Sequence, residues 1–395
     1  MKKGNFEKQI NEIPREVKWC KLCTMSNQRP RIKFDSSGVC AGCLNKSYKS
    51  KINWSERERE LKELLDKHRS KNGSYDVIVP SSGGKDSGYV AHTLKYKYNM
   101  NPLTVTWSPL SYTDIGKKNF YGLVNSGLTN FLCTINGSLQ RKLARLSLEE
   151  LGDAFHVFVL GQISFPFHIA KKLNIKLVFY GENGELEYAG DVEGSDKPYK
   201  EPKFWTKQHF KGSDIKEIIK FGLKEKDYLL NEDINHPDLS WFTPPSEGEL
   251  FESGIKGKYF FSYYHNWTPQ ENYYYCSKNT GFLPSIERNE GTYSRYASLD
   301  DKIDGFHYYM RYIKFGLGRC AEDTAHEIRD GHITRKEGVA LMRKYEGEFP
   351  KKYYNFFLKY LNINQKQFND IVDSWRSEHL WEKKNNKWTL KYPIK

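Results

Sequence analysis

A short loop near the start of the chain combines the residue types that bind phosphate. An apolar run, Asp76-Val-Ile-Val-Pro80, is followed by Ser81 and then by Ser82, Gly83, Gly84, Lys85, Asp86 and Ser87. The two glycines allow the backbone to close around phosphate oxygens, because a Cβ there would keep the backbone away. Lysine adds a positive charge, aspartate can hold Mg²⁺, and serine hydroxyls donate hydrogen bonds. We expect a phosphate site here, with Lys85 and Asp86 also taking part in catalysis.

Four cysteines form a second motif. Two Cys-x2-Cys pairs, 16 residues apart, are formed by Cys20, Cys23, Cys40 and Cys43. Four thiolates at these spacings provide the tetrahedral sulfur shell that zinc prefers, and a closed shell leaves no position for water. We therefore expect a structural zinc site, with four unrelated reduced cysteines or an iron–sulfur cluster as alternatives. Basic residues between the pairs are expected to offset the negative charge: Arg29, Arg31 and Lys33.

Polar residues also follow two of the apolar runs. Glu182, Asn183 and Glu187 come just after Ile175-Lys-Leu-Val-Phe-Tyr180, and Thr106 lies near the end of Pro102–Trp107. Doubly wound proteins place their ligands at the carboxyl ends of the strands. We expect Glu182 and Asn183 to be catalytic, Glu187 to contact substrate and Thr106 to contact the nucleotide. A helix-capping turn is the alternative for the first three.

Strands and helices that would position these residues alternate between residues 75 and 180. Four apolar runs are predicted to be buried strands: 75–80, 102–107, 130–135 and 175–180. Helices are predicted at 88–98 and 161–173 between them, and Trp54–His68 forms a charged helix with a stripe of leucines. This alternation indicates an α/β fold with a doubly wound, mostly parallel sheet.

The chain divides into four expected regions. Residues 1–50 form the cysteine module, 51–190 the nucleotide-binding α/β domain, 191–298 an irregular elaboration that covers the substrate, and 299–395 a helical region. Thr334 and Glu337 have capping-box spacing ahead of one of these last helices.

Composition excludes several classes of protein. The 395 residues are 15% aromatic, which argues against disorder, and no run of about 18 apolar residues indicates a membrane span. The N-terminal residues have no apolar signal-peptide core, and the cysteine pattern favours a reducing cytoplasm. A net charge of +13 suits nucleic acid, ATP or anionic metabolites equally.

The motif Ser82-Gly-Gly-Lys-Asp-Ser87 resembles the PP-loop of the ATP pyrophosphatase superfamily, whose fold is that of the adenine nucleotide alpha-hydrolases. This resemblance implies that ATP is bound by its pyrophosphate with Mg²⁺. AMP is then transferred to a carbonyl-type oxygen, and a nitrogen or sulfur nucleophile displaces it. Pyrophosphate leaves more easily when the loop and the cation stabilise its developing charge.

Most of the chain resembles the N-acetyl sugar amidotransferases of bacterial surface-polysaccharide biosynthesis, including O-antigen and nonulosonic acid pathways. The resemblance rests on the cysteine pairs, the loop and six further stretches: Phe179–Asn183, Tyr188–Gly190, Leu299–Gly305, Ile313–Arg319, Ala325–Gly331 and Thr334–Gly338. It implies that an acetamido group, on a free sugar or a UDP-sugar, becomes an acetamidino group. The acetamido oxygen would be adenylated and ammonia would displace AMP. Four residues become candidates for sugar or phosphate contacts, with a solvated helix face as the alternative: Asp301, Lys302, Lys314 and Arg319.

The nitrogen source is expected to be a separate protein. The chain shows no glutaminase motif, and the family implies a glutaminase partner, with a cyclase-like subunit to conduct the ammonia. A tRNA-thiolating enzyme is the main alternative, but Cys133, Cys276 and Cys320 are isolated and form no second pair. A zinc-bearing binding module without activity is a further alternative, against which the intact Lys85, Asp86 and Ser87 argue.

Overall fold

The computed structural model describes residues 4–190, 197–204 and 215–395. Its centre is a six-stranded sheet with the order β3-β2-β1-β4-β6-β5. The strands are β1 (Val77–Pro80), β2 (Pro102–Trp107), β3 (Thr129–Cys133), β4 (Leu177–Tyr180), β5 (Tyr199–Lys200) and β6 (Lys258–Phe260). All neighbouring pairs are parallel except β5 with β6. The predicted α/β class and mostly parallel sheet are confirmed.

The direction of winding reverses at β1. The chain passes from β1 to β2 and β3 on one side, and then returns to place β4 on the other side of β1. The segments that leave β1 and β4 therefore diverge and leave a crevice between them, which is where ligands bind in open α/β sheets. The phosphate-binding motif follows β1 and Glu182 follows β4, so the topology brings both to this point.

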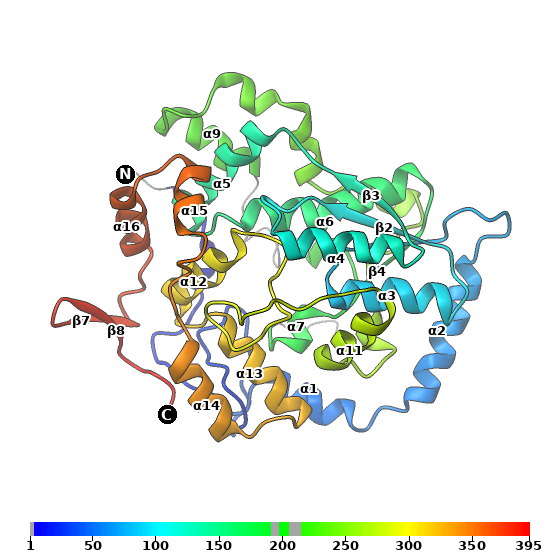
Figure 1. Cartoon of the computed structure of the whole chain (residues 1–395), viewed down its shortest axis with the longest axis horizontal. Helices are drawn as coiled ribbons and strands as arrows, with labels where there is room; N and C mark the ends of the chain where they lie inside the picture. Colours follow the sequence, from blue (N-terminus) through cyan, green and yellow to red (C-terminus); the bar gives the residue numbers. More distant parts are fainter. Residues whose placement is uncertain (1–3, 191–196, 205–214) are drawn as a thin grey trace.

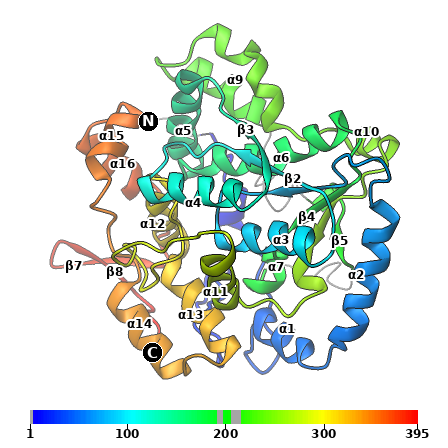
Figure 2. The same cartoon turned by 45° about the vertical axis from the view of Figure 1, so that its right-hand side comes forward.

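Helices cover both faces of the sheet, as Figures 1 and 2 show. Successive side chains of a strand point to opposite faces. Val77 and Val79 of β1 belong to the core that includes α3 (Lys85–Tyr96), whereas Ile78 belongs to the core that includes α5 (Gly137–Leu151) and α6 (His156–Lys172). The strand is apolar throughout because both of its faces are buried.

The strand β3 differs from the prediction. It was expected to be buried, but Phe131 is 41% exposed and Leu132 is 46% exposed. The reason is its position, because β3 lies at the edge of the sheet that the described residues form and pairs there with β2 alone. An apolar run in the sequence does not distinguish an edge strand from a central one.

The N-terminal region packs on two parts of the chain: its cysteines share a buried cluster with residues between Leu317 and Met342, and Leu61 and Leu65 share a core with the sheet. It comprises the short 3-10 helix η1 (Lys8–Asn11), α1 (Ala41–Lys49) and α2 (Trp54–His68). The bounds of α2 agree with the prediction, because Asn53 accepts a hydrogen bond from the backbone N–H of Glu56 and so begins the helix.

Residues 191–298 contain more regular structure than expected, although 191–196 and 205–214 lie outside the described residues. This part of the chain supplies the sheet strands β5 and β6 and the helix α11 (Pro269–Asn279), which packs on α3. Other helices of the elaboration are α9 (Ile215–Glu225), η2 (Asn231–Asn235), η3 (Pro237–Phe242), α10 (Glu247–Glu252) and η4 (Phe261–Tyr263). Two further helices belong to the sheet domain: α4 (Asp114–Asn125) and α7 (Gly184–Glu187).

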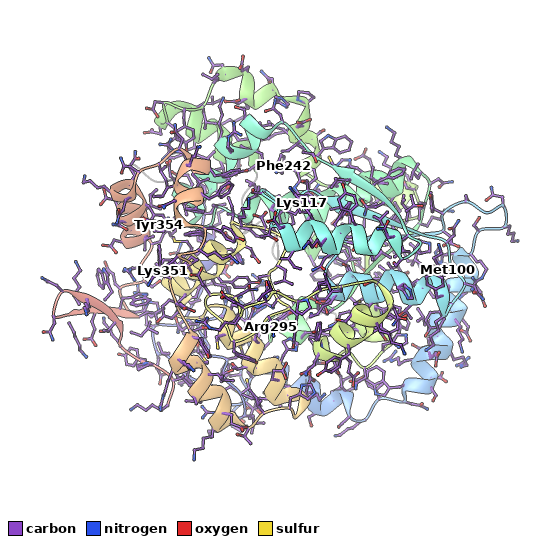
Figure 3. The ribbon with its side chains drawn as sticks, viewed as in Figure 1. Met100, Lys117, Phe242, Arg295, Lys351 and Tyr354 are labelled. Atoms are coloured by element: carbon purple, nitrogen blue, oxygen red, sulfur yellow. The ribbon has the colours of Figure 1, made fainter. Side chains whose placement is uncertain are left out.

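The C-terminal region is helical, as predicted. Its helices are α12 (Asp304–Phe315), α13 (Arg319–Asp330), α14 (Arg335–Tyr345), α15 (Tyr354–Leu361) and α16 (Gln365–Ser374), followed by the hairpin of β7 (Trp381–Lys384) and β8 (Lys387–Leu390). The capping box of Thr334 and Glu337 is present at the start of α14. In Figure 3, Arg295 lies at the centre of the view, while Lys351 and Tyr354 lie toward the side formed by α15 and α16. Of the helices among the described residues, none has the length and apolar character needed to cross a membrane.

An aromatic cluster joins α12 to α15 and α16. The ring of Phe306 stacks on that of Phe357 at 3.8 Å between centroids, and Phe368 packs edge-on against both. Because Phe306 is only 1% exposed, truncation would leave a cavity that its neighbours cannot fill.

We expect Phe306→Ala to lower the free energy of unfolding by about 3–5 kcal/mol, the usual cost of removing a buried phenylalanine ring. Urea titration followed by tryptophan fluorescence measures it. Phe251→Ala is the matched control, since that ring is 85% exposed, and it should change stability by less than about 0.5 kcal/mol. Equal effects of the two substitutions would contradict this packing.

Candidate active site

The loop between β1 and α3 has a backbone that only glycine can adopt at one position. Gly83 has φ +92°, and a Cβ there would lie 2.6 Å from backbone atoms of Phe120 in α4. At Gly84 a Cβ would contact nothing closer than the Ser82 hydroxyl at 3.7 Å. The first glycine is therefore required by its contact with α4, while the second leaves an open space beside the loop.

Serine side chains hold the loop in this shape. The Ser81 and Ser87 hydroxyls are 2.8 Å apart, and Ser87 also donates to the carbonyl of Gly84. The Thr106 hydroxyl donates to the carbonyl of Ser81 and itself accepts a hydrogen bond from Asn130. Ser87 and Thr106 were both predicted to contact ATP. Their hydroxyl groups instead hydrogen-bond to the loop, and neither residue lines the cavity beside it.

A cavity of about 330 Å³ lies beside the loop. Its lining includes most of the predicted phosphate site, one predicted residue after β4 and one from α13: Ser82, Gly83, Gly84, Lys85, Asp86, Glu182 and Arg319. The N-terminus of α3 faces this space, so its backbone N–H groups and helix dipole favour an anion there. The fold therefore brings four of the predicted charged residues into one cavity wall: Lys85, Asp86, Glu182 and Arg319.

Opposite charges lie close together within this cavity. Lys85 pairs with the carboxylate of Asp86, whose other oxygen accepts a hydrogen bond of 3.0 Å from Asn272 of α11. Burial and the nearby charge of Asp86 raise the pKa of Glu182 to about 7, although Lys85 opposes the shift. Two carboxylates that disfavour each other's charge are suited to share a divalent cation.

The start of α13 supplies the far wall. Arg319 donates to Asp323 at 2.9 Å and to the hydroxyl of Tyr308 at 2.7 Å. Burial by itself would raise the pKa of Glu322, but three arginines hold it below its usual range: Arg311, Arg29 and Arg319. Glu322 is therefore charged, and its ion pair with Arg311, 2.6 Å long, fixes it in place.

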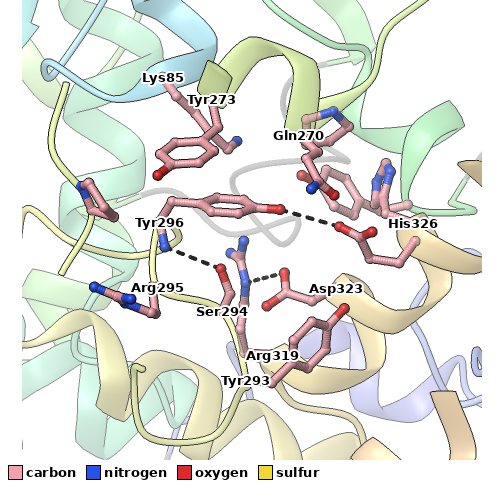
Figure 4. A pocket seen from close by; sticks show the side chains of 14 residues that line it. Lys85, Gln270, Tyr273, Tyr293, Ser294, Arg295, Tyr296, Arg319, Asp323 and His326 are labelled. Carbon is pink, nitrogen blue, oxygen red and sulfur yellow. Dashed lines mark hydrogen bonds and ion pairs between the residues drawn. The ribbon is translucent and has the colours of Figure 1, made fainter. Parts of the chain in front are cut away.

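A second cavity of about 340 Å³ adjoins the first, and both are lined by Lys85, Tyr188, Tyr296 and Arg319. Figure 4 shows the tyrosine rings around it and the ion pair of Arg319 with Asp323. The two cavities together offer space for a nucleotide and for a second molecule next to it.

Two residues predicted after β4 have structural roles. The side chain of Asn183 caps α7 by accepting a hydrogen bond of 3.2 Å from the N–H of Glu185. Glu187 forms a buried ion pair with Lys49, which ties α7 to α1. Neither side chain lines the two cavities. The helix-capping alternative thus describes Asn183, and the geometry does not support its catalytic role or a substrate contact by Glu187.

Three of the four predicted sugar or phosphate contacts also lie outside these cavities. Asp301 is 4% exposed and accepts hydrogen bonds from the backbone of Leu110 and Ile303. Lys314 is 2% exposed and donates to Glu7 and to the carbonyl of Leu151. Lys302 lies 4.9 Å from the ring of Phe356 and, with Asp301, faces a third cavity that shares Tyr308 and Arg319 with the first. Spacing in the sequence could not show that two of these charges are used within the protein.

Several residues of the site were not predicted. Asp300, next to the predicted Asp301, lines the first cavity, where burial raises the pKa of its carboxyl group and the nearby Ser82 hydroxyl opposes the shift. Asn119, Tyr188 and Tyr296 also line it. Asp300 belongs to a stretch with two adjacent aspartates, and the sequence could not distinguish which of them points inward.

The four cysteines meet in one cluster, as predicted. Their sulfur atoms all lie within 4.8 Å of one another, with Cys20 and Cys43 at 3.9 Å and Cys23 and Cys40 at 3.6 Å. Zinc–sulfur bonds of about 2.3 Å in a tetrahedron require sulfurs about 3.8 Å apart. The arrangement therefore fits a zinc ion.

Arg329 of α13, and not the basic residues between the cysteine pairs, faces the sulfurs. Its Nη2 lies 3.8 Å from Cys23 Sγ and 3.9 Å from Cys40 Sγ. Burial disfavours its charge, but the cysteines outweigh this and raise the pKa of Arg329 above its ordinary value. Arg31, expected to offset the negative charge, instead pairs with Glu185 at 2.8 Å.

Comparison with known proteins finds a family model for the C-terminal region, one curated relative and a solved structure. Residues 290–394 match the family model "LPS biosynthesis protein WbpG-like, C-terminal domain". The uncharacterized protein MJ1599 of Methanocaldococcus jannaschii is 31% identical over 87 residues, which are 22% of this chain and 31% of that protein. The NMN synthetase from Francisella tularensis is similar over 60% of this chain and 89% of its own, with 15% identity and a TM-score of 0.27. The chain thus spans about a third of the curated relative, and its C-terminal region resembles that of an LPS biosynthesis protein.

We expect Cys40→Ser to lose the bound metal, because three thiolates and a hydroxyl form a much weaker shell for zinc. Metal content of the purified protein, measured by atomic emission, should fall from about one zinc per chain to a small fraction of that. Cys133→Ser, at the sheet edge, is the control and should retain the metal. A parent protein without zinc, or a metal-loaded Cys40→Ser, would overturn the assignment.

Proposed function

We propose that this chain is an ATP-dependent amidotransferase that converts an N-acetyl group of a bacterial surface sugar into an acetamidino group. The observation that supports it most is the joint cavity. One wall of this cavity is formed by the loop Ser82–Asp86. The opposite wall is formed by residues within 290–394, the part that matches the LPS biosynthesis model. A nucleotide and a sugar substrate would therefore meet between these two parts.

The loop would bind the phosphates of ATP. The N-terminus of α3 and Lys85 face the cavity and would stabilise the negative charge that develops on pyrophosphate. Asp86 and Glu182 would hold Mg²⁺. A magnesium site commonly takes one or two protein carboxylates and completes its shell with phosphate oxygens and water, and these two carboxylates face the same cavity.

The reaction proposed from the family resemblance proceeds in two steps. The acetamido oxygen attacks the α-phosphorus of ATP, the bond to the β-phosphate oxygen breaks, and pyrophosphate leaves. Ammonia then attacks the activated carbon, the bond from that carbon to oxygen breaks, and AMP leaves with the former acetamido oxygen. Adenylation is required because an amide oxygen by itself is a poor leaving group.

Sulfur transfer to tRNA, the alternative, receives less support from the cysteines outside the metal cluster. Cys276 is buried, and its thiol donates to the carbonyl of Lys85 at 2.9 Å. Burial raises the pKa of this thiol to about 12, so a thiolate nucleophile is not available at neutral pH. Cys320 is likewise fully buried, among the residues packed against the metal cluster.

The remaining parts of the proposal follow from the same reaction. Zinc in the cysteine cluster would be structural. Ammonia would come from a separate glutaminase, with a cyclase-like subunit as its conduit, and the protein would work in the cytoplasm, where ATP and nucleotide-linked sugars are present.

The decisive experiment follows the acetamido oxygen of the sugar with an ¹⁸O label. The protein is incubated with ATP, Mg²⁺, ammonium and a UDP-linked N-acetyl sugar that carries ¹⁸O in the acetamido group. We expect AMP that contains the label, unlabelled pyrophosphate and a sugar in which NH replaces oxygen, all measured by mass spectrometry. If the sugar acquires no nitrogen across a panel of free and nucleotide-linked N-acetyl sugars, or if the label stays out of AMP, the proposed function is wrong.

Lys85→Ala should reduce this turnover by at least about 100-fold, because one charged donor to a developing oxyanion contributes on this scale. Zinc content should be unchanged, since Lys85 does not touch the cysteine cluster. Lys97→Ala, at the other end of α3 and 51% exposed, is the control and should keep the parent rate. Full activity in Lys85→Ala would contradict the assignment of the loop.

The pKa of Glu182 near 7 predicts a pH dependence of nucleotide binding. Protons and Mg²⁺ compete for the same carboxylate, so Mg²⁺-dependent affinity should fall as the pH decreases below 7, by up to about tenfold per unit. Calorimetry with a non-hydrolysable ATP analogue at pH 6, 7 and 8 measures it. In Glu182→Gln this part of the dependence should vanish, leaving only the titration of the nucleotide. An identical profile in parent and variant would exclude Glu182 from the cation site.

A further inference from the structure

The cavity next to the nucleotide site has the walls of a site for a polar ring. The rings of Tyr273 and Tyr296 are stacked at 4.7 Å between centroids and 13° between planes. They form one side of the space that Figure 4 shows, opposite the charged residues of α13. Flat aromatic faces bind the C–H faces of a sugar through dispersion, while polar groups at the edges bind its hydroxyl and amide groups.

Most polar groups around this cavity already have partners. The Tyr296 hydroxyl donates to Glu327 at 3.2 Å, and Asp323 accepts hydrogen bonds from Arg319 and Thr292. His326 is the exception on this wall of α13. It is 7% exposed, and its buried Nε2 has no hydrogen-bond partner within the described parts of the chain.

The Tyr293 hydroxyl, in the same cavity wall, is a second buried polar atom without a partner among the described residues. Native proteins pair nearly all such atoms, so two orphans around one cavity indicate a polar ligand that completes them. The ring of His326 is held by an edge-to-face contact with Tyr188 at 4.6 Å. Its position is thus set by packing, while its buried Nε2 has no hydrogen-bond partner among the described residues.

The surroundings of His326 keep the imidazole neutral. Burial lowers its pKa well below the ordinary value, and four cations act in the same direction: Arg329, Lys49, Lys85 and Arg319. Two acidic residues also face the cavity, but Asp323 pairs with Arg319, and Glu327 binds Tyr296 and His332. A neutral imidazole has a lone pair that can take a proton. The same burial and cations weaken it as a base, so they favour rapid release of that proton.

We propose that the tyrosine-walled cavity holds the acetamido group of the acceptor sugar and that His326 accepts the proton released when ammonia adds to it. This inference rests on the proposed function. It assigns the acceptor site to residues of α11, α13 and the segment between α11 and α12, in place of the predicted contacts that the fold uses elsewhere.

The proton transfer balances with the second step of the reaction. Ammonia forms a bond to the adenylated carbon through its lone pair. The π bond between that carbon and the sugar nitrogen breaks, its electron pair moves to the sugar nitrogen, and the added ammonia becomes a cationic substituent. His326 takes one proton from that nitrogen. The nitrogen lone pair then forms the carbon–nitrogen double bond as the bond from carbon to the AMP oxygen breaks. The imidazolium passes its proton to the departing AMP phosphate, and the histidine returns to its neutral form.

Single-turnover measurements with His326→Gln and His326→Asn test this role, with enzyme in excess over an N-acetyl sugar. Pyrophosphate release without ammonium reports adenylation, and amidine formation after ammonium is added reports nitrogen transfer. We expect adenylation within about threefold of the parent, and nitrogen transfer slower by about 100-fold or more, the usual contribution of a general base. His379→Gln, whose ring binds Gln28 away from the cavity, is the control for histidine replacement and should match the parent in both steps.

Each other outcome is informative. Nitrogen transfer at the parent rate in both variants overturns the role of His326. An equal loss in both steps also overturns it, because the histidine would then position a substrate and not move a proton. If the parent itself releases no pyrophosphate in response to any N-acetyl sugar, the proposed function fails first, and it does so before any variant is compared.

Discussion

The backbone of Gly83 lies so close to the backbone of Asn119 and Phe120 that no side chain fits between them. This contact fixes the distance between the loop after β1 and the helix α4, and so sets where α3 begins. Because Lys85 and Asp86 are the first residues of α3, their side chains enter the cavity only if the loop keeps this path. The hydrogen bonds of Ser81, Ser87 and Thr106 stabilise the same loop conformation.

The helix α13 connects the two chemical centres of the molecule. Arg319, Glu322, His326 and Arg329 recur every three or four residues, so they lie along one side of the helix. Arg319 and Glu322 face the cavity beside the loop, His326 faces the tyrosine-walled cavity, and Arg329 faces the cysteine sulfurs. Thr24 of the cysteine module also bonds to Ala321 and Thr324 of this helix. A metal ion in the cluster would therefore stabilise the position of α13 and, through it, the walls of both cavities.

The proposed chemistry depends on burying charges beside one another. Lys85 and Arg319 lie among Asp86, Glu182 and Glu322 in the wall of one cavity. Such a set is costly to desolvate unless each charge has a partner. Within this set, burial and the charge of Asp86 raise the pKa of Glu182 to about 7, so its charged form is poorly stabilised by the protein. A divalent cation bound with the nucleotide would stabilise that charge.

The sequence by itself determined the parts of this protein that depend on local chemistry. The central strands, the bounds of α2, the capping box of α14 and the glycine–lysine–aspartate loop were all predictable, because each follows from neighbouring residues or from a short spacing. The cysteine cluster was predictable for the same reason, since its two pairs have fixed spacing. The parallel sheet followed from the alternation of strands and helices.

Only the tertiary structure decided which polar side chains are free to act. Asn183, Glu187, Asp301 and Lys314 resemble site residues in the sequence, but each is used by a neighbour far along the chain or by a helix end. Arg319 lines both cavities, and Arg329 reaches the cysteine sulfurs from a segment more than 200 residues along the chain. The exposure of β3 was decided in the same way, by its position at the sheet edge. A charged residue looks the same in a sequence whether or not it forms an ion pair, and an apolar run looks the same in an edge strand and in a central one. The fold determines which neighbour each of them has.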